Sequence, residues 1–129
     1  MTRALTILAA FLLIVHGLIH LLGTAVYARR HSINGLPYKT KLLGGRWDLG
    51  DAGIRVFGWL WVLPAFGFVA AAVALLAGRP SWEPVLLTVT IFSLVITLLD
   101  WSSAYMGAVI DVLILILVFL PPRLMGRLF

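Results

Sequence analysis

LLIVHGLIHLLG, residues 12–23, decides the fold because it is an apolar run that carries two histidines. His16 and His20 are four residues apart, so they lie on one face of a helix. The apolar segment around them extends over about residues 4–26. A helix needs roughly 17 to 25 such residues to cross a hydrocarbon core of about 30 Å. The sequence therefore predicts a membrane-spanning helix with a polar stripe.

The composition of the whole chain extends this prediction. The 129 residues are 62% hydrophobic and 12% charged, whereas soluble domains are about half apolar and about a quarter charged. The segments that are long and apolar enough to span a membrane are about 4–26, 54–77, 84–101 and 103–120. We therefore expect one all-α domain over residues 1–129, an integral membrane four-helix bundle with one long loop between its first two helices.

The charged residues predict how this bundle lies in the cell membrane. Six Lys and Arg residues fall between positions 28 and 55, and four fall on the other side. Positive charge favours the cytoplasmic side, so we expect loop 28–53 in the cytoplasm and both termini outside. A secretory signal, with Arg3 before an apolar core and small residues near Ala28, is an alternative for the first segment. That segment is longer than a typical signal core, which favours a retained helix.

Charge and cysteine content also exclude several functions. The net charge of +5 is concentrated in a loop beside the bilayer, where it favours anionic head groups rather than nucleic acid. The absence of cysteine excludes disulfides, thiolate nucleophiles and thiolate-bound metals. The expected partner is the lipid bilayer. A membrane-protein partner or a homo-oligomer is left open.

Local signals predict the joints between helices. Pro64 has no N–H for the Leu60 carbonyl, so the second helix should kink there. The sequence DWSS, residues 100–103, predicts a tight hairpin between the last two helices. NGLP, residues 34–37, predicts a turn. The pair of prolines at 121–122 predicts the end of the last helix.

Polar residues recur at helical spacing on several helices and should meet inside the bundle. Counting 1.5 Å per residue from each segment's centre places His16, Ser93 and Asp111 at one depth near the midplane. His20 and Thr97 fall one turn nearer the loop, and Asp100, together with Thr24, falls nearer still. The candidate binding residues are therefore His16, His20, Ser93, Thr97, Asp100 and Asp111. They predict a polar funnel that opens toward the loop, with the loop packed across its mouth.

Asp111 most needs an explanation, because an ionisable group at the bilayer centre costs at least about 2.5 kcal/mol. We expect it to hold its proton and to donate it to a neutral His16, since a low dielectric disfavours both charged forms. The first interpretation of the cluster is structural: interhelical hydrogen bonds that fix the helix register. The alternative is a ligand- or proton-binding site built on His16, His20 and Asp111, with or without a bound metal.

Cofactor chemistry is not assigned from these residues. Two histidines and one carboxylate form a ligand set that iron or zinc uses, but a third histidine or second carboxylate is not close by in the sequence. Haem needs axial ligands on opposite faces of the iron, which His16 and His20 on one helix face cannot provide. A catalytic nucleophile with a base is not evident either. The sequence thus favours an accessory or structural membrane protein over an autonomous enzyme.

HGLIHLLG, residues 16–23, and WSSAYMGAVIDVLILI, residues 101–116, resemble a group of small four-helix bacterial membrane proteins with a first-helix HGLIHL motif. The group's conserved-looking positions correspond here to His16, His20, Trp101, Ala104 and Gly107. Asp111 stands at the group's Asn and Ser103 at its Asp. The resemblance implies the four-helix membrane fold and no particular activity. DoxX-like proteins share this architecture, but their motif is not found here.

Overall fold

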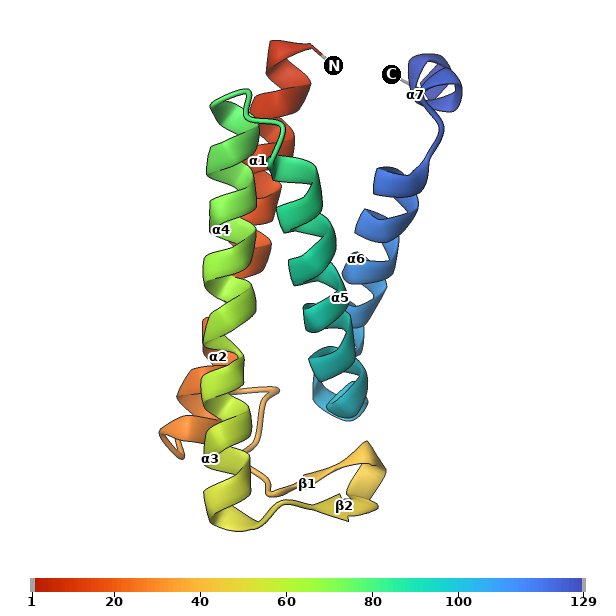
Figure 1. Cartoon of the computed structure of the whole chain (residues 1–129). Helices are drawn as coiled ribbons and strands as arrows, with labels where there is room; N and C mark the ends of the chain where they lie inside the picture. Colours follow the sequence, from red (N-terminus) through yellow and green to blue (C-terminus); the bar gives the residue numbers. More distant parts are fainter. Residues whose placement is uncertain (1, 129) are drawn as a thin grey trace.

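Helices form most of the structure, a computed structural model that describes residues 2–128 (Figure 1). The first helical run contains α1 (Arg3–Ile19), α2 (Leu21–Gly23) and a π-helical turn, η1 (Thr24–Ala28). The second contains α3 (Gly50–Leu60) and α4 (Val62–Leu76). The remaining long helices are α5 (Trp82–Leu99) and α6 (Trp101–Phe119), and a short α7 (Pro122–Leu128) follows.

Within residues 2–128, four helical runs are long and apolar enough to cross a membrane: 3–28, 50–76, 82–99 and 101–119. Each agrees with a predicted segment to within four residues. The largest difference is at the second run, which begins at Gly50 rather than at residue 54. Its first turn contains Asp51 and two glycines, Gly50 and Gly53, so this turn has little of the hydrophobicity on which the prediction was based. The all-α prediction is confirmed.

Each of the first two runs is interrupted once near its middle. The Trp61 amide bonds the Gly58 carbonyl, three residues back, at 3.3 Å. This break lies one turn before Pro64, which has no N–H to offer the Leu60 carbonyl, so the helix is interrupted where the proline predicts. The first run breaks at His20 and continues through the π turn. The break at His20 and the π turn were not predicted, because a single irregular turn barely changes the hydrophobic period.

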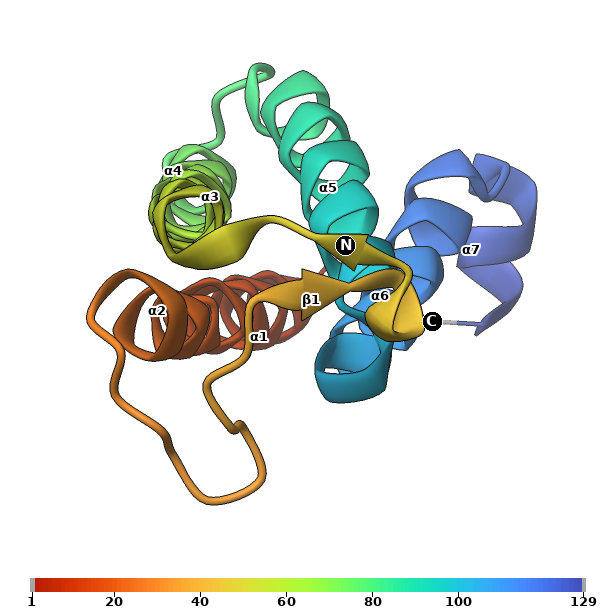
Figure 2. The same cartoon turned by 90° about the horizontal axis from the view of Figure 1, so that it is seen from below.

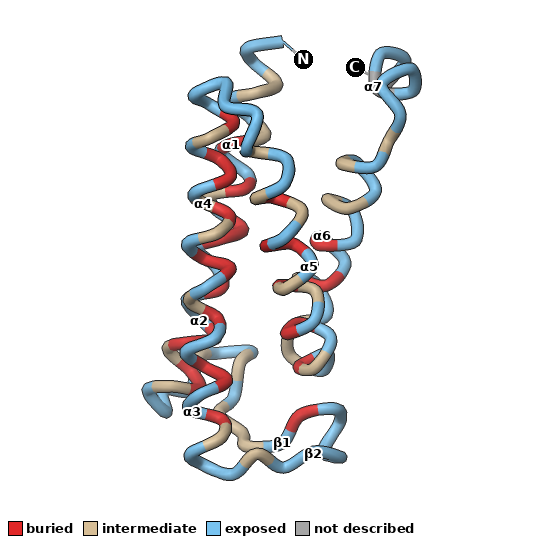
Figure 3. Tube along the Cα trace, in the orientation of Figure 1, coloured by how far each residue is buried: buried red, intermediate tan, exposed pale blue. Residues whose placement is uncertain are grey.

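Neighbouring helices pack in the order α1, α4, α5 and α6. Buried residues follow stripes on the facing sides of the helices (Figure 3). One apolar core, around Phe68 and Ala71, lies between α1, α4 and α5. A second core, around Tyr27 and Ile54, joins η1 and α3 to the loop. Small residues permit close approach, and Gly58 packs directly against the Tyr27–Ala28 backbone.

The ends of α6 differ in detail from the prediction. The helix begins at Trp101, directly after Asp100, so the hairpin is tighter than the predicted DWSS connection. It ends at Phe119, close to the prolines as expected. Pro122, however, opens the short helix α7. Proline is tolerated in the first turn of a helix, where its missing N–H would have no partner.

The loop between the first two runs is ordered by two small antiparallel pairs. Ile33 and Leu36 bridge around a turn in which Gly35 has φ +83°, which confirms the turn predicted at NGLP. Strands β1 (Lys41–Leu42) and β2 (Trp47–Asp48) pair across the short 3-10 helix η2 (Leu43–Gly45). Seen from below, this hairpin crosses the end of the helices, and η2 contacts α6 (Figure 2). Two-residue strands are too short for a sequence period, so the hairpin was not predicted.

Candidate functional site

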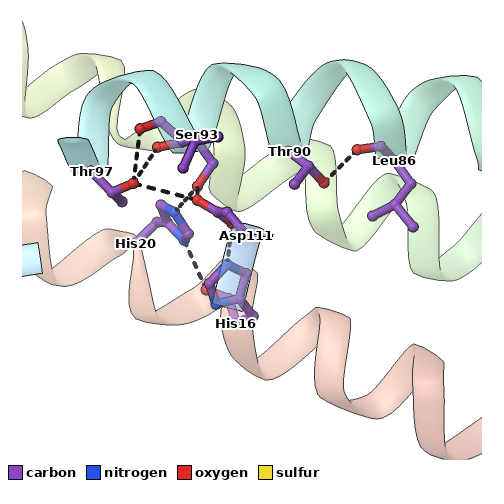
Figure 4. A network of polar contacts seen from close by, with 8 residues as sticks. His16, His20, Leu86, Thr90, Ser93, Thr97 and Asp111 are labelled. Atoms are coloured by element: carbon purple, nitrogen blue, oxygen red, sulfur yellow. Dashed lines mark hydrogen bonds and ion pairs between the residues drawn. The ribbon is translucent and has the colours of Figure 1, made fainter. Parts of the chain in front are cut away.

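Four polar residues from three helices meet in the interior, and we call them the central cluster: His16, His20, Ser93 and Asp111 (Figure 4). The histidines come from the first helical run, the serine from α5 and the aspartate from α6. Ser93 and Asp111 are fully buried, and His16 and His20 are 7% and 3% exposed. Their burial confirms the predicted inward orientation, and hydrogen bonds join His16 and Ser93 to Asp111, the residues predicted to share one depth.

Hydrogen bonds join the central cluster into one chain. His16 Nε2 lies 2.9 Å from Asp111 Oδ1. The Ser93 hydroxyl lies 2.6 Å from Asp111 Oδ2, and His20 Nε2 lies 2.7 Å from the same hydroxyl oxygen. The serine therefore bridges His20 to the second oxygen of the carboxyl group, and both carboxyl oxygens have a partner.

The break in the first helix orients His20. The His20 amide bonds the Gly17 carbonyl at 3.1 Å, and His20 Nδ1 lies 2.8 Å from the His16 carbonyl oxygen. A carbonyl oxygen can only accept, so Nδ1 must carry a proton. In a neutral imidazole, Nε2 is then an acceptor that faces Ser93. The backbone thus selects the tautomer of His20.

The hydrogen bonds that link His20, Ser93 and Asp111 need one proton more than the serine hydroxyl provides. Two hydrogen bonds link His20 Nε2, the Ser93 oxygen and Asp111 Oδ2, and they require two protons. Serine supplies one. The second is either on Asp111, as a carboxylic acid with a neutral His20, or on His20, as an imidazolium with a carboxylate. With Nε2–H of a neutral His16 donating to Oδ1, both arrangements satisfy every contact and have zero net charge. This is the reverse of the direction predicted from the sequence, because a proton donated by Asp111 to His16 would not be available to the bonds through Ser93.

Thr97 and Thr90 extend the polar stripe of α5 but are bonded mainly within it. Thr97 Oγ1 donates to the Ser93 carbonyl at 2.9 Å and lies 3.5 Å from Asp111 Oδ2. Thr90 Oγ1 donates to the Leu86 carbonyl at 2.6 Å. Such bonds to the preceding turn are common for hydroxyls in membrane helices. Thr97 therefore borders the central cluster rather than completing it.

Aromatic rings surround the two imidazoles. The His16 ring lies 4.7 Å from the Phe68 ring, nearly edge to face. The His20 ring lies 5.5 Å from both Phe68 and Trp61. These rings belong to α4 and to the break that precedes it. They give the cluster a low-dielectric wall, which strengthens its internal hydrogen bonds.

Asp100 belongs to a different group of residues, the loop-side cluster: Tyr27, Lys39, Asp100 and Ser103. The Tyr27 hydroxyl donates to Asp100 Oδ2 at 2.5 Å, and Lys39 Nζ lies 2.7 Å from Asp100 Oδ1. Lys39 also donates to Ser103 Oγ at 2.5 Å. Thr24, predicted at a depth similar to that of Asp100, does not bond it and donates to the Gly58 carbonyl at 2.8 Å. The predicted packing of the loop across this end of the bundle is confirmed by Lys39.

Tyr27 and Lys39 were missed as site residues. Tyr27 continues the stripe of His16, His20 and Thr24 by a further three residues, so helical spacing could have identified it. Lys39 had no such signal. It lies in a loop, and its place beside Asp100 depends on the path of residues 29–49.

A cavity of about 220 Å³ connects the two clusters. His16, His20 and Thr97 line one end, and Tyr27, Asp100 and Ser103 line the other. Four of the six candidate residues, His16, His20, Thr97 and Asp100, therefore line one space, although the candidates form two hydrogen-bonded groups. The predicted funnel corresponds to this space.

The central cluster also contains a possible set of metal ligands. His16, His20 and Asp111 each offer one ligand atom, and these atoms lie within 4.8 Å of one another. A ligating histidine usually donates its other ring N–H to a backbone carbonyl or a carboxylate, and His20 does so toward His16. Hydrogen bonds already join these atoms, directly or through Ser93, so each of them has a partner without a metal ion.

Two side chains of the loop have shifted pKa values. The Gly50 amide donates to Asp48 Oδ1 at 3.0 Å, and this bond lowers the pKa of Asp48. The Tyr38 hydroxyl donates to Asp51 Oδ1 at 2.7 Å, which raises the pKa of Tyr38. Asp48 is exposed and Tyr38 is half-buried, so these contacts order the loop and do not form a fully buried site.

In comparisons with known proteins, no family model, no curated protein and no solved structure matches this chain. The resemblance to small membrane proteins with an HGLIHL motif therefore stays a prediction. Arguments about function rest on the residues and contacts described above.

Proposed function

We propose that the chain is a multi-pass integral membrane protein of the cell membrane, folded as a transmembrane four-helix bundle with loop 28–53 in the cytoplasm. Four apolar helices within residues 2–128 support this proposal. Large hydrophobic side chains are also exposed along them, among them Phe11, Phe66 and Ile116. In water such a surface would aggregate, whereas in a bilayer it contacts lipid.

We further propose that its function is to bind a proton at the central cluster, shared between Asp111 and His20 through Ser93. The observation that carries this proposal is the His20–Ser93–Asp111 chain, whose two contacts at 2.7 and 2.6 Å need one more proton than serine provides. Intramembrane ionisable residues commonly belong to proton or ligand pathways. The cavity beside the histidines supports access to this site.

A purely structural cluster is the alternative to this function. Helix register can be fixed by hydroxyl and amide groups, each contributing about 0.6 to 2 kcal/mol. Such a cluster does not need a carboxyl group, whose burial carries a desolvation cost. The proposed function is that of a proton-binding membrane protein rather than a catalytic one, since the cluster holds a proton but offers no activated nucleophile.

The experiment locates the proton by nuclear magnetic resonance in detergent micelles at pH 7. Carboxyl ¹³C shifts of Asp111 and imidazole ¹⁵N shifts of His16 and His20 report their protonation directly. We expect either a protonated Asp111 with neutral imidazoles or a carboxylate with a protonated His20. A carboxylate beside two neutral imidazoles would overturn the proposal. Ser93→Ala removes the bridge and should abolish the coupling between the His20 and Asp111 shifts.

The substitution Asp111→Asn separates the proton from the hydrogen bonds. An Asn oxygen can accept from His16 Nε2, and its amide can donate to Ser93, which then donates to His20. This variant reproduces the protonated form, so we expect its melting temperature to stay within a few degrees of the parent between pH 6 and 8. A loss of many degrees, or a steep pH dependence only in the parent, would show that the charge itself is required.

A further inference from the structure

We infer that the cavity between the two clusters binds a membrane-soluble ligand with a small, hydrogen-bond-accepting ring as its head and an apolar tail. The cavity holds about 220 Å³ and is lined by histidine, tyrosine, threonine and aspartate side chains at its ends. This inference rests on the proposed membrane location. It does not depend on where the shared proton resides.

The walls of the cavity point to entry from the bilayer. Ile19 on the first helical run and Met106 on α6 both line the cavity, yet they are 53% and 58% exposed. They belong to helices whose main packing partners are α4 and α5, respectively. The cavity therefore opens sideways between the first run and α6, on a surface that lipid would cover. A ligand dissolved in the bilayer can reach it without crossing water.

Trp61 indicates that the ligand carries a hydrogen-bond acceptor. This side chain lines the cavity and is 7% exposed, and its indole N–H has no hydrogen-bond partner among residues 2–128. A buried donor without an acceptor is unfavourable, because it loses its hydrogen bond to water and gains none in the protein. A ligand with a carbonyl or ether oxygen would satisfy it, whereas a hydrocarbon would not.

Size and polarity narrow the ligand class further. Small-molecule pockets are mostly apolar with a few placed polar groups, and this cavity combines Val26, Leu36 and Ile110 with the polar residues at its two ends. Its volume is close to that of one substituted six-membered ring and is too small for a lipid with two chains. The tail would leave between Ile19 and Met106, where the wall is apolar. The site thus fits a single ring on a hydrocarbon tail.

The experiment follows the Trp61 indole N–H resonance of the full chain in micelles, assigned through Trp61→Phe. The probes are a decyl-substituted benzoquinone, which has ring oxygens, and decylbenzene, which has the same tail and no acceptor. We expect the benzoquinone to shift the Trp61 resonance downfield with saturation. Decylbenzene should leave it near its starting position. Saturable shifts from both probes, or from neither, would overturn the inference.

A blocking variant and its control test the location. Ala104 lines the cavity, so Ala104→Leu should fill it and weaken benzoquinone binding at least tenfold. Ala70 is exposed on α4, and Ala70→Leu should leave binding unchanged. If Ala104→Leu does not fold, Ile110→Trp serves as a second filling variant. Equal binding by the parent and a folded filling variant would place the ligand elsewhere. The Asp111 and His20 shifts decide the proton proposal separately.

Discussion

The central and loop-side clusters each bury an aspartate, but they satisfy it in different ways. Asp111 is bonded by an imidazole and a hydroxyl, all carried on helices. Asp100 is bonded by the Tyr27 hydroxyl and by the Lys39 ammonium, which the loop supplies. In the proposed central cluster, a shared proton completes the hydrogen bonds of Asp111. In the loop-side cluster, the positive charge of Lys39 pairs with Asp100. Depth explains the difference, because a long lysine can reach the end of the bundle but not its middle.

This contrast predicts different responses to mutation. Asp111 and its partners are enclosed, so a lost partner cannot be replaced by water. Lys39 retains 25% of its side-chain exposure, and its ammonium can turn to solvent when Asp100 is removed. The central cluster should therefore be the more sensitive of the two, even though it contains no fixed ion pair.

The largest expected effect comes from Asp111→Leu. This change removes the acceptor of His16 Nε2–H and leaves Ser93 with His20 as its partner, and breaking a buried pair on one side costs about 3 to 5 kcal/mol. Unfolding in mixed micelles measures the free energy. Asp111→Asn is the matched control, with an expected loss below about 1 kcal/mol because its hydrogen bonds can all be made. Similar losses in the two variants would contradict the proton count.

The double variant His16→Leu with Asp111→Leu should be less destabilised than Asp111→Leu alone. With both partners gone, Ser93 can donate to His20, and replacing both members of a pair by apolar groups is often close to neutral. We expect a loss of about 1 to 2 kcal/mol and, because Asp111→Leu alone loses more, a coupling energy of at least about 2 kcal/mol in a double-mutant cycle. A loss that exceeds that of the single variant would show that the two residues do not act as a pair.

Much of the central cluster could be predicted from the sequence, for a physical reason. A transmembrane helix has a fixed rise and period, so depth and face follow from residue number alone. His16, Ser93 and Asp111 were assigned to one depth in this way, and they are joined by hydrogen bonds. The role of Ser93 as a bridge could not be predicted, because it depends on the side-chain rotamer and on the break at His20.

The loop-side cluster was less accessible to the same reasoning. Asp100 was identified as buried and polar, but its partner Lys39 lies more than 60 residues away in a loop without a period. The two-residue strands and the turn at Gly35 set the path of that loop. Only the turn had a sequence signal. Contacts between distant residues could therefore not be predicted where one of the partners lies in an irregular segment.

Lys39→Met tests the loop-side cluster directly and should have a moderate effect. Asp100 keeps the Tyr27 hydroxyl but loses its cation, and we expect a loss of about 1 to 2 kcal/mol, reduced by the partial exposure of the pair. The expected loss should fall at high salt, unlike that of Asp111→Leu. Lys41→Met, at an exposed position of β1, is the control. An equal loss in both lysine variants would argue against a specific contact with Asp100.

The smallest expected effect is the contribution of Asp48 to the pH dependence of stability, and the direction of its pKa shift gives the sign of that contribution. Its pKa lies below the ordinary value of 3.8, first because the Gly50 amide donates to its carboxylate and next because Thr40 does. A lowered pKa means that folding favours the ionised form. This contribution to stability is complete at pH values above 3.8 and is lost as the pH falls through the lower, folded value. Acidification should therefore loosen the start of α3 and the β1–β2 hairpin before the bundle itself unfolds.

The Gly50 amide resonance, followed from pH 6 to pH 2, measures this effect. In the parent it should move with a midpoint below 3.8, as the carboxylate that accepts its hydrogen takes up a proton. Asp48→Asn keeps an acceptor oxygen but cannot titrate, so its Gly50 resonance should stay nearly constant. A midpoint above 3.8, or a simultaneous change in the imidazole shifts of His16 and His20, would show that the loop and the interior titrate together.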